Sequence, residues 1–120
     1  MSKADALRLP EYFRHILEAI ERIHHYVEDM DEIAFLNDRK TQDAVIRNLE
    51  VIGEAARNIE RYHKQFADEH DYLPLGFACE MRNALSHGYF KVDLEIVWKT
   101  IHADLPVLHA QIKQLLAEIK

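Results

Sequence analysis

Apolar residues recur along most of this chain at the spacing of helices that pack together. Over residues 10–30 they are alternately four and three positions apart, a period of 3.5 that is typical of helices in a bundle. The same alternation returns from about residues 37–41 to residue 66, and from residue 93 to the end. The positions in the three seams are Leu9, Phe13, Ile16, Ile20, Ile23, Val27 and Met30; Val45, Leu49, Ile52, Ala56, Ile59, His63 and Phe66; and Leu94, Trp98, Ile101, Leu105, Leu108, Ile112, Leu115 and Ile119.

Polar segments between these seams predict where helices end. Residues 29–37 interrupt the first two seams, with a short turn expected at residues 32–35, and residues 67–72 are expected to form a loop. A short helix over about residues 74–87 then precedes the last seam. Three long apolar seams and one short helix predict an all-α fold, an up-down four-helix bundle.

Small residues and helix breakers refine this prediction. Gly53 and Ala56 leave room for a neighbouring helix to approach closely. Asp93 is a suitable N-cap for the last helix. Pro106 lies inside the last seam, where it removes a backbone hydrogen bond near Ile101–His102. We therefore expect that helix to kink or split.

Composition adds limits on class and location. The 120 residues, 48% hydrophobic and 30% charged, favour one globular domain over residues 1–120, and three glycines with three prolines are too few for a turn-rich β fold. A net charge of −6 (15 − 21) argues against broad, non-specific phosphate binding. The single cysteine, Cys79, excludes an intrachain disulfide. With no apolar run long enough for a membrane span and no apolar signal core, we expect a cytoplasmic protein.

The densest group of reactive side chains lies in Cys79–Asp93, with the sequence CEMRNALSHGYFKVD. It holds Arg82, Asn83, His87 and Tyr89 within eight positions, at the expected end of the short helix. An arginine can hold a phosphate through two parallel hydrogen bonds, and a histidine can exchange protons near neutral pH. Together they are the minimum for cleaving RNA by attack of its own 2′-hydroxyl group.

The spacing of Arg82 and His87 limits how they could act together. Five residues of helix turn the chain by about 500°, which places the two side chains roughly 140° apart. They converge only if the helix ends between them or if a second subunit completes the site, and a two-fold dimer would supply two of each. The first and last seams are long for one small core, which favours a homodimer. The alternative is a surface arginine and a helix-capping histidine without chemistry.

A pair of Glu-x-x-His steps, Glu21–His24 and Glu60–His63, suggests a second kind of site. A di-iron carboxylate bundle uses two such steps and an inward-facing glutamate from each other helix. In the last helix only Asp104 could point inward at mid-length, so the ligand set is incomplete. Solvated side chains with one partly buried histidine are the favoured interpretation. No phosphate-binding or dinucleotide-binding glycine loop is present, and we expect no cofactor.

The segment RNALSHGY resembles the R-N-x-x-x-H-x-Y motif of HepT-like toxins, a branch of the HEPN superfamily. Thr41–Ile59, TQDAVIRNLEVIGEAARNI, is similar to the second helix of that family. Met81–Ile112 is similar to its third helix, motif and fourth helix. Together these segments cover roughly half of the chain.

The resemblance implies an all-α homodimer whose active site is shared between subunits. It implies that Arg82 and His87 are the catalytic pair for metal-independent cleavage of an RNA substrate, and that Asn83 supports them. It further implies that Tyr89 receives AMP from a partner nucleotidyltransferase of the MNT type, which acts as the antitoxin. The alternative function is a non-catalytic HEPN subunit that presents substrate or nucleotide to a nucleotidyltransferase.

Overall fold

The computed structural model describes residues 8–75 and 93–119, and within them the chain is entirely helical or irregular, with no strand. The helices are α1 (Leu9–Val27), α2 (Glu32–Leu36), α3 (Arg39–Tyr62), α4 (Lys64–Glu69), α6 (Leu94–Ala103) and α7 (Leu105–Glu118). The prediction of an all-α bundle is confirmed. The predicted short helix over residues 74–87 lies almost wholly outside the described residues.

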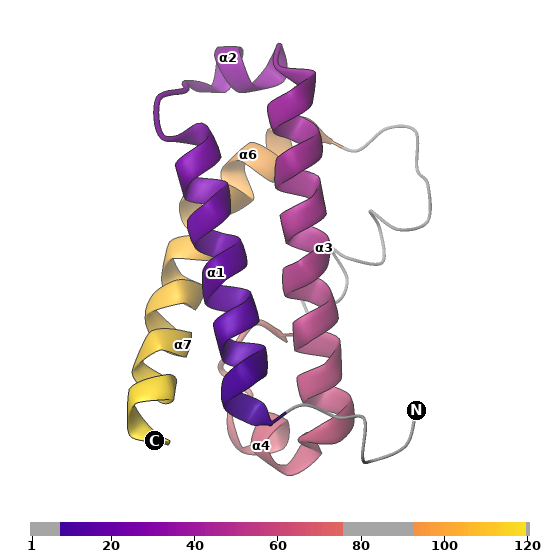
Figure 1. Cartoon of the computed structure of the whole chain (residues 1–120), viewed down its shortest axis with the longest axis vertical. Helices are drawn as coiled ribbons and strands as arrows, with labels where there is room; N and C mark the ends of the chain where they lie inside the picture. Colours follow the sequence, from indigo (N-terminus) through magenta and orange to yellow (C-terminus); the bar gives the residue numbers. More distant parts are fainter. Residues whose placement is uncertain (1–7, 76–92, 120) are drawn as a thin grey trace.

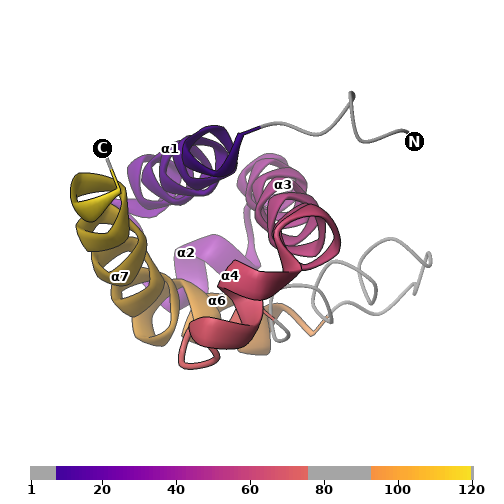
Figure 2. The same cartoon turned by 90° about the horizontal axis from the view of Figure 1, so that it is seen from below.

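The long helices lie side by side along the length of the molecule (Figure 1). α1 packs against α3 on one side and against α7 on the other. Both α3 and the α6–α7 pair run in the direction opposite to α1 (Figure 1). α2 closes one end of the bundle and contacts α3 and α6, and α4 turns under the other end (Figure 2).

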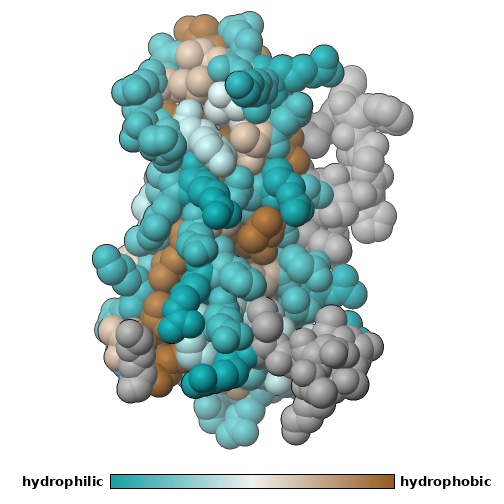
Figure 3. All heavy atoms as spheres, in the orientation of Figure 1, coloured by the Kyte–Doolittle hydropathy of each residue, from teal (hydrophilic) through white to brown (hydrophobic). Residues whose placement is uncertain are grey.

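The predicted seams form the core of the described part of the chain. In α1, four apolar residues at the alternating spacing are fully buried: Phe13, Ile16, Ile20 and Ile23. The seams of α3 and α6–α7 meet them with Val45, Leu49, Ile52, Ala56 and Ile59, and with Ile101, Leu105, Leu108, Ile112 and Leu115. The outer face that carries α1 and α3 is largely hydrophilic, with narrow strips of apolar side chains (Figure 3). None of the described helices is both long and apolar enough to cross a membrane.

Small side chains are buried on both α1 and α3, which make the most extensive helix contact among the described residues. Ala19 on α1 and Ala56 on α3 have no exposed surface, and Gly53 and Ala55 are buried beside them. A helix pair can pack this closely only where side chains on the facing surfaces are short. The predicted role of the small residues is therefore consistent with their burial.

Aspartate side chains cap three of the described helices, as their preference for N-caps predicts. The side chain of Asp31 accepts a hydrogen bond from the N–H of Ala34 at 2.8 Å, and Asp38 accepts one from Thr41 at 3.1 Å. Asp93 accepts from the first turn of α6, as predicted. These bonds satisfy N–H groups that have no partner inside their own helix.

The predicted end of α3 is wrong by several residues. α3 ends at Tyr62 rather than near Phe66, and residues 64–69, partly expected to be a loop, form α4. The chain bends at His63, where the ring lies edge-on to Tyr12 with centroids 5.9 Å apart. The bend brings Phe66 against Phe13, with centroids 5.5 Å apart. The helix that the spacing would have continued to Phe66 is thus replaced by a bend at His63 and the separate helix α4.

The remaining boundaries differ less. α1 ends at Val27, three residues before the seam does, and the expected turn at residues 32–35 is the helix α2. The last helix splits at Asp104 into α6 and α7, with Pro106 in the first turn of α7, which confirms the predicted effect of the proline.

Candidate functional site

The four residues predicted to form a site, Arg82, Asn83, His87 and Tyr89, lie outside the described residues. The structure therefore does not test whether they come together, and their roles stay predictions. What it does define is the position of the two ends of the segment that carries them, residues 76–92.

The first end of this segment is fixed in the core. Leu73 and Leu75 are both buried, at 4% and 3% exposure. The turn that leads into them is held by the N–H of Leu73, which donates to the carbonyl of His70 at 3.0 Å. The segment that carries the motif therefore starts from a fixed point on the bundle.

The second end is fixed by a helix cap. The Asp93 carboxylate accepts hydrogen bonds from the N–H groups of Glu95 and Ile96, at 3.1 and 3.2 Å. α6 is then held in the core through the buried Val97 and Ile101. Asp93 comes six residues after His87 in the sequence, and the orientation of α6 sets the position of Asp93.

The described residues do not form the di-iron site weighed above. His63 contacts Tyr12 near the start of α1, and His24 lies twelve residues further along, which is about 18 Å of helix. Glu60 is exposed, and Glu21 is bonded to His109 instead. In the part of the chain that the structure describes, no three side chains of the metal-binding types gather as a ligand set.

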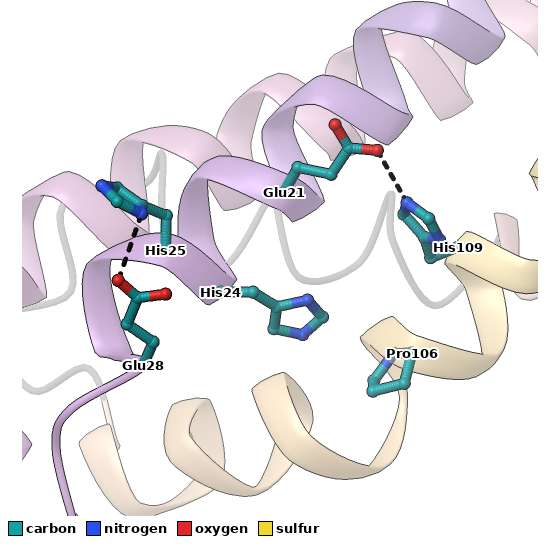
Figure 4. A pocket seen from close by; sticks show the side chains of 6 residues that line it. All are labelled: Glu21, His24, His25, Glu28, Pro106 and His109. Carbon is teal, nitrogen blue, oxygen red and sulfur yellow. Dashed lines mark hydrogen bonds and ion pairs between the residues drawn. The ribbon is translucent and has the colours of Figure 1, made fainter.

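A hollow of about 540 Å³ lies between α1 and the junction of α6 and α7. It is lined by Glu21, His24, His25, Glu28, Pro106 and His109 (Figure 4). The Nε2 atom of His109 lies 2.8 Å from a carboxylate oxygen of Glu21, and because a carboxylate only accepts, the ring donates. His25 lies 3.4 Å from Glu28 on its own helix.

His24 points from α1 toward the α6–α7 junction (Figure 4). Its Nε2 atom lies 3.2 Å from the main-chain oxygen of Ile101. The sequence indicated Glu21 and His24 only as one Glu-x-x-His step, and it pointed to no partner for either on the last helix. The partners are 77 and 88 residues apart, and no local spacing signals such pairs.

Comparison with known proteins agrees with the sequence resemblance. A family model described as "Ribonuclease HepT-like" matches residues 16–115. The chain is 41% identical over 105 residues to "Probable ribonuclease HepT" of Thermococcus cleftensis, which covers 88% of this chain and 93% of that protein. It is 35% identical over 109 residues to "Putative RNase TTE0752" of Caldanaerobacter subterraneus, covering 91% and 95%.

A longer relative contains a second named activity. The chain is 38% identical over 108 residues to "Gamma-glutamylcyclotransferase and putative RNase MJ0434" of Methanocaldococcus jannaschii. That match covers 90% of this chain but only 47% of the relative, so the chain spans about half of its length. No solved structure matches the chain.

Proposed function

The chain belongs to the HepT-like ribonuclease family, and from this premise we propose that it is an RNA-cleaving toxin of a toxin–antitoxin pair. The observation that carries the proposal is the family match over residues 16–115, which includes the motif with Arg82, Asn83, His87 and Tyr89. Proteins named as ribonucleases match the chain over nearly their whole length.

The proposed reaction needs only groups that the motif and the RNA supply. The 2′-oxygen of the RNA attacks the adjacent phosphorus and loses its proton to a base, while the bond to the 5′-oxygen breaks and that oxygen gains a proton. The products are a 2′,3′-cyclic phosphate and a 5′-hydroxyl end. His87 takes or returns the proton, and Arg82 stabilises the charge that builds on the phosphate oxygens. Asn83 orients the phosphate, and no metal ion takes part.

We further propose that the active site is shared between two copies of the chain. If the short helix continues through Arg82 and His87, its geometry turns their side chains about 140° apart, and a two-fold partner brings Arg82 of one copy to His87 of the other. Tyr89, two residues beyond His87, is the proposed site of AMP addition by an MNT-type nucleotidyltransferase. The added phosphate would repel the RNA backbone and occupy the cleft.

A cleavage assay tests the reaction. The purified protein is incubated with end-labelled single-stranded RNA in excess EDTA, beside His87→Ala, Arg82→Ala and the control His15→Ala, an exposed histidine of α1. We expect cleavage to 2′,3′-cyclic phosphate ends by the wild type and the control, and a loss of at least about 10²-fold in the two motif variants. Equal cleavage by wild type and His87→Ala would remove the catalytic assignment.

Mixing the two inactive variants tests the shared site. A mixed dimer of Arg82→Ala and His87→Ala subunits holds one shared site with both side chains intact. Random exchange of subunits makes half of the dimers mixed, so roughly one quarter of the wild-type rate should return. No recovery, in a mixture shown to exchange subunits, would place each site within one subunit.

The alternative function, a non-catalytic companion of a nucleotidyltransferase, predicts a different result. A preparation that binds RNA or nucleotide but never cleaves, together with unimpaired growth on expression, would favour it. Intact mass after co-expression with a candidate MNT-type enzyme tests the control residue. Added AMP that disappears in Tyr89→Phe is the expected result, and AMP retained in that variant would exclude Tyr89.

A further inference from the structure

The break between α6 and α7 leaves a buried main-chain oxygen without its usual helical partner. Pro106 has no N–H to donate to His102, and the hydrogen bonds on either side of the break run from Asp104 to Thr100 at 3.0 Å and from Leu108 to Asp104 at 3.1 Å. Among the described residues, no backbone N–H across the break bonds to the carbonyl of Ile101. Ile101 has no exposed surface.

In a continuous helix the N–H of Leu105 would donate to the Ile101 carbonyl, and here a side chain from α1 takes its place. The Nε2 atom of His24 lies 3.2 Å from the Ile101 oxygen. A carbonyl oxygen only accepts, so the proton must be on Nε2. A buried acceptor without a donor is costly, and this hydrogen bond removes that cost at the point where the helix is interrupted.

The neighbouring pair holds the other side of the break. Glu21 lies three residues before His24 on α1, and it accepts a hydrogen bond from His109 on α7 at 2.8 Å (Figure 4). α1 is therefore bonded to the end of α6 through His24 and to α7 through Glu21. The two bonds flank Pro106, and together they restrain the angle at which α6 leaves α7.

The angle between α6 and α7 is important because the segment with the predicted catalytic residues comes directly before α6 in the sequence. α6 contains ten residues, about 15 Å of helix, and its first residue follows directly after the cap at Asp93. A change of about 10° at the break would move the far end of α6 by roughly 2.6 Å over that length. Displacements of about 1 Å at a catalytic group can reduce a rate 10²-fold. Apolar contacts hold the buried face of α6 but are non-directional, whereas a hydrogen bond fixes direction.

We propose that His24 is a positioning residue of the ribonuclease: its hydrogen bond to Ile101, beside the Glu21–His109 pair, sets the orientation of α6. This orientation in turn sets where the chain leaves the segment that carries His87. The inference rests on the proposed function for its effect on rate, and on the bond itself for its effect on α6. His24 touches no RNA in this proposal and is not a catalytic residue.

Three variants separate the hydrogen bond from the volume of the ring. His24→Leu fills the space but has no donor, and His24→Gln keeps a donor N–H at a similar reach. His25→Ala is the matched control, because His25 is the adjacent, exposed histidine and its described partner, Glu28, is on the same helix. All three are compared in the full chain, at a temperature where melting curves show each to be folded.

The kinetic measurement is cleavage of labelled RNA with kcat and KM determined separately. For His24→Leu we expect kcat to fall at least about tenfold with KM nearly unchanged, because RNA-binding groups are not altered. His24→Gln should recover most of the rate, and His25→Ala should equal the wild type. A wild-type kcat in folded His24→Leu, or no recovery in His24→Gln, would overturn the proposal.

Hydrogen exchange gives a measurement that does not need ribonuclease activity. If His24 restrains α6, the amides at its start, such as Val97, should exchange faster in His24→Leu than in wild type, His24→Gln or His25→Ala. Unchanged exchange would overturn the proposal whatever the enzyme does. A wild type without ribonuclease activity but with faster exchange in His24→Leu would contradict the proposed function and leave the restraint on α6 standing.

Discussion

The tight contact between α1 and α3 makes a prediction that can be worked from burial alone. Ala56 has no exposed surface and lies in the α3 seam that packs against α1. Replacing it with leucine adds three carbon atoms at a fully buried position. Because α1 and α3 form the most extensive helix contact among the described residues, the extra volume has to separate them or force strained side chains.

Overpacking of this kind costs about 1–3 kcal/mol of the free energy of unfolding. For a chain of this size that is a fall in Tm of roughly 4–15 °C. Arg57→Leu is the matched control, because Arg57 is the next residue of the same helix, is exposed, and receives the same new side chain. Alanine, leucine and arginine are all good helix formers, so helix propensity contributes little to the difference.

The assay is urea unfolding followed by circular dichroism, with the midpoint and slope fitted for each variant. We expect the midpoint of Ala56→Leu to fall with an unchanged slope, and Arg57→Leu to stay close to the wild type. An Ala56→Leu protein as stable as the wild type would show that the α1–α3 contact has free space. The account of the small residues would then be wrong.

Three further predictions concern single polar groups. Asp93→Ala should lower the free energy of unfolding by about 0.5–2 kcal/mol through loss of the α6 cap, and Asp93→Asn by much less, both measured by urea unfolding. Hydrogen bonds from Thr41, first from its backbone N–H, hold the pKa of Asp38 in the folded protein below its usual 3.8. The ionised Asp38 therefore stabilises the fold above pH 3.8, and this stabilisation is lost as the pH falls through the lower pKa of the folded state. The stability gap between wild type and Asp38→Asn should therefore close in acid, and a gap independent of pH would refute this. The Gln111 side-chain oxygen is buried without a hydrogen bond among the described residues, so Gln111→Met should leave the protein as stable or more stable in thermal melts, and clear destabilisation would contradict it.

The sequence was sufficient for those features that depend on local spacing. The alternating seams identify the buried faces of α1, α3 and α6–α7, because a helix that must bury one side shows it directly in its own period. Asp93 and Pro106 mark the start of α6 and the break after it for equally local reasons, a side-chain acceptor and a missing N–H.

Features that depend on contacts distant in sequence could not be predicted in this way. The seam of α3 continues unbroken to Phe66, yet the helix ends at Tyr62, and Phe66 packs on Phe13 of α1 from the separate helix α4. Likewise, the sequence located a disrupted backbone bond near Ile101–His102 but gave no sign that His24 would supply the donor. Only the assembled bundle places that ring beside the Ile101 carbonyl.

The candidate site combines both kinds of information. Its residue types are local, since Arg82 to Tyr89 can be recognised from the motif together with the segments that flank it, while the positions of the segment ends depend on the whole core. Leu75 is buried at one end and Asp93 caps α6 at the other, so both attachment points belong to the same packed body. Substitutions that move α6 should therefore alter catalysis without touching the motif, whereas exposed substitutions on α1 should not. If substitutions that move α6 and exposed substitutions on α1 had the same effect on the cleavage rate, the motif would have to act independently of the bundle that carries it.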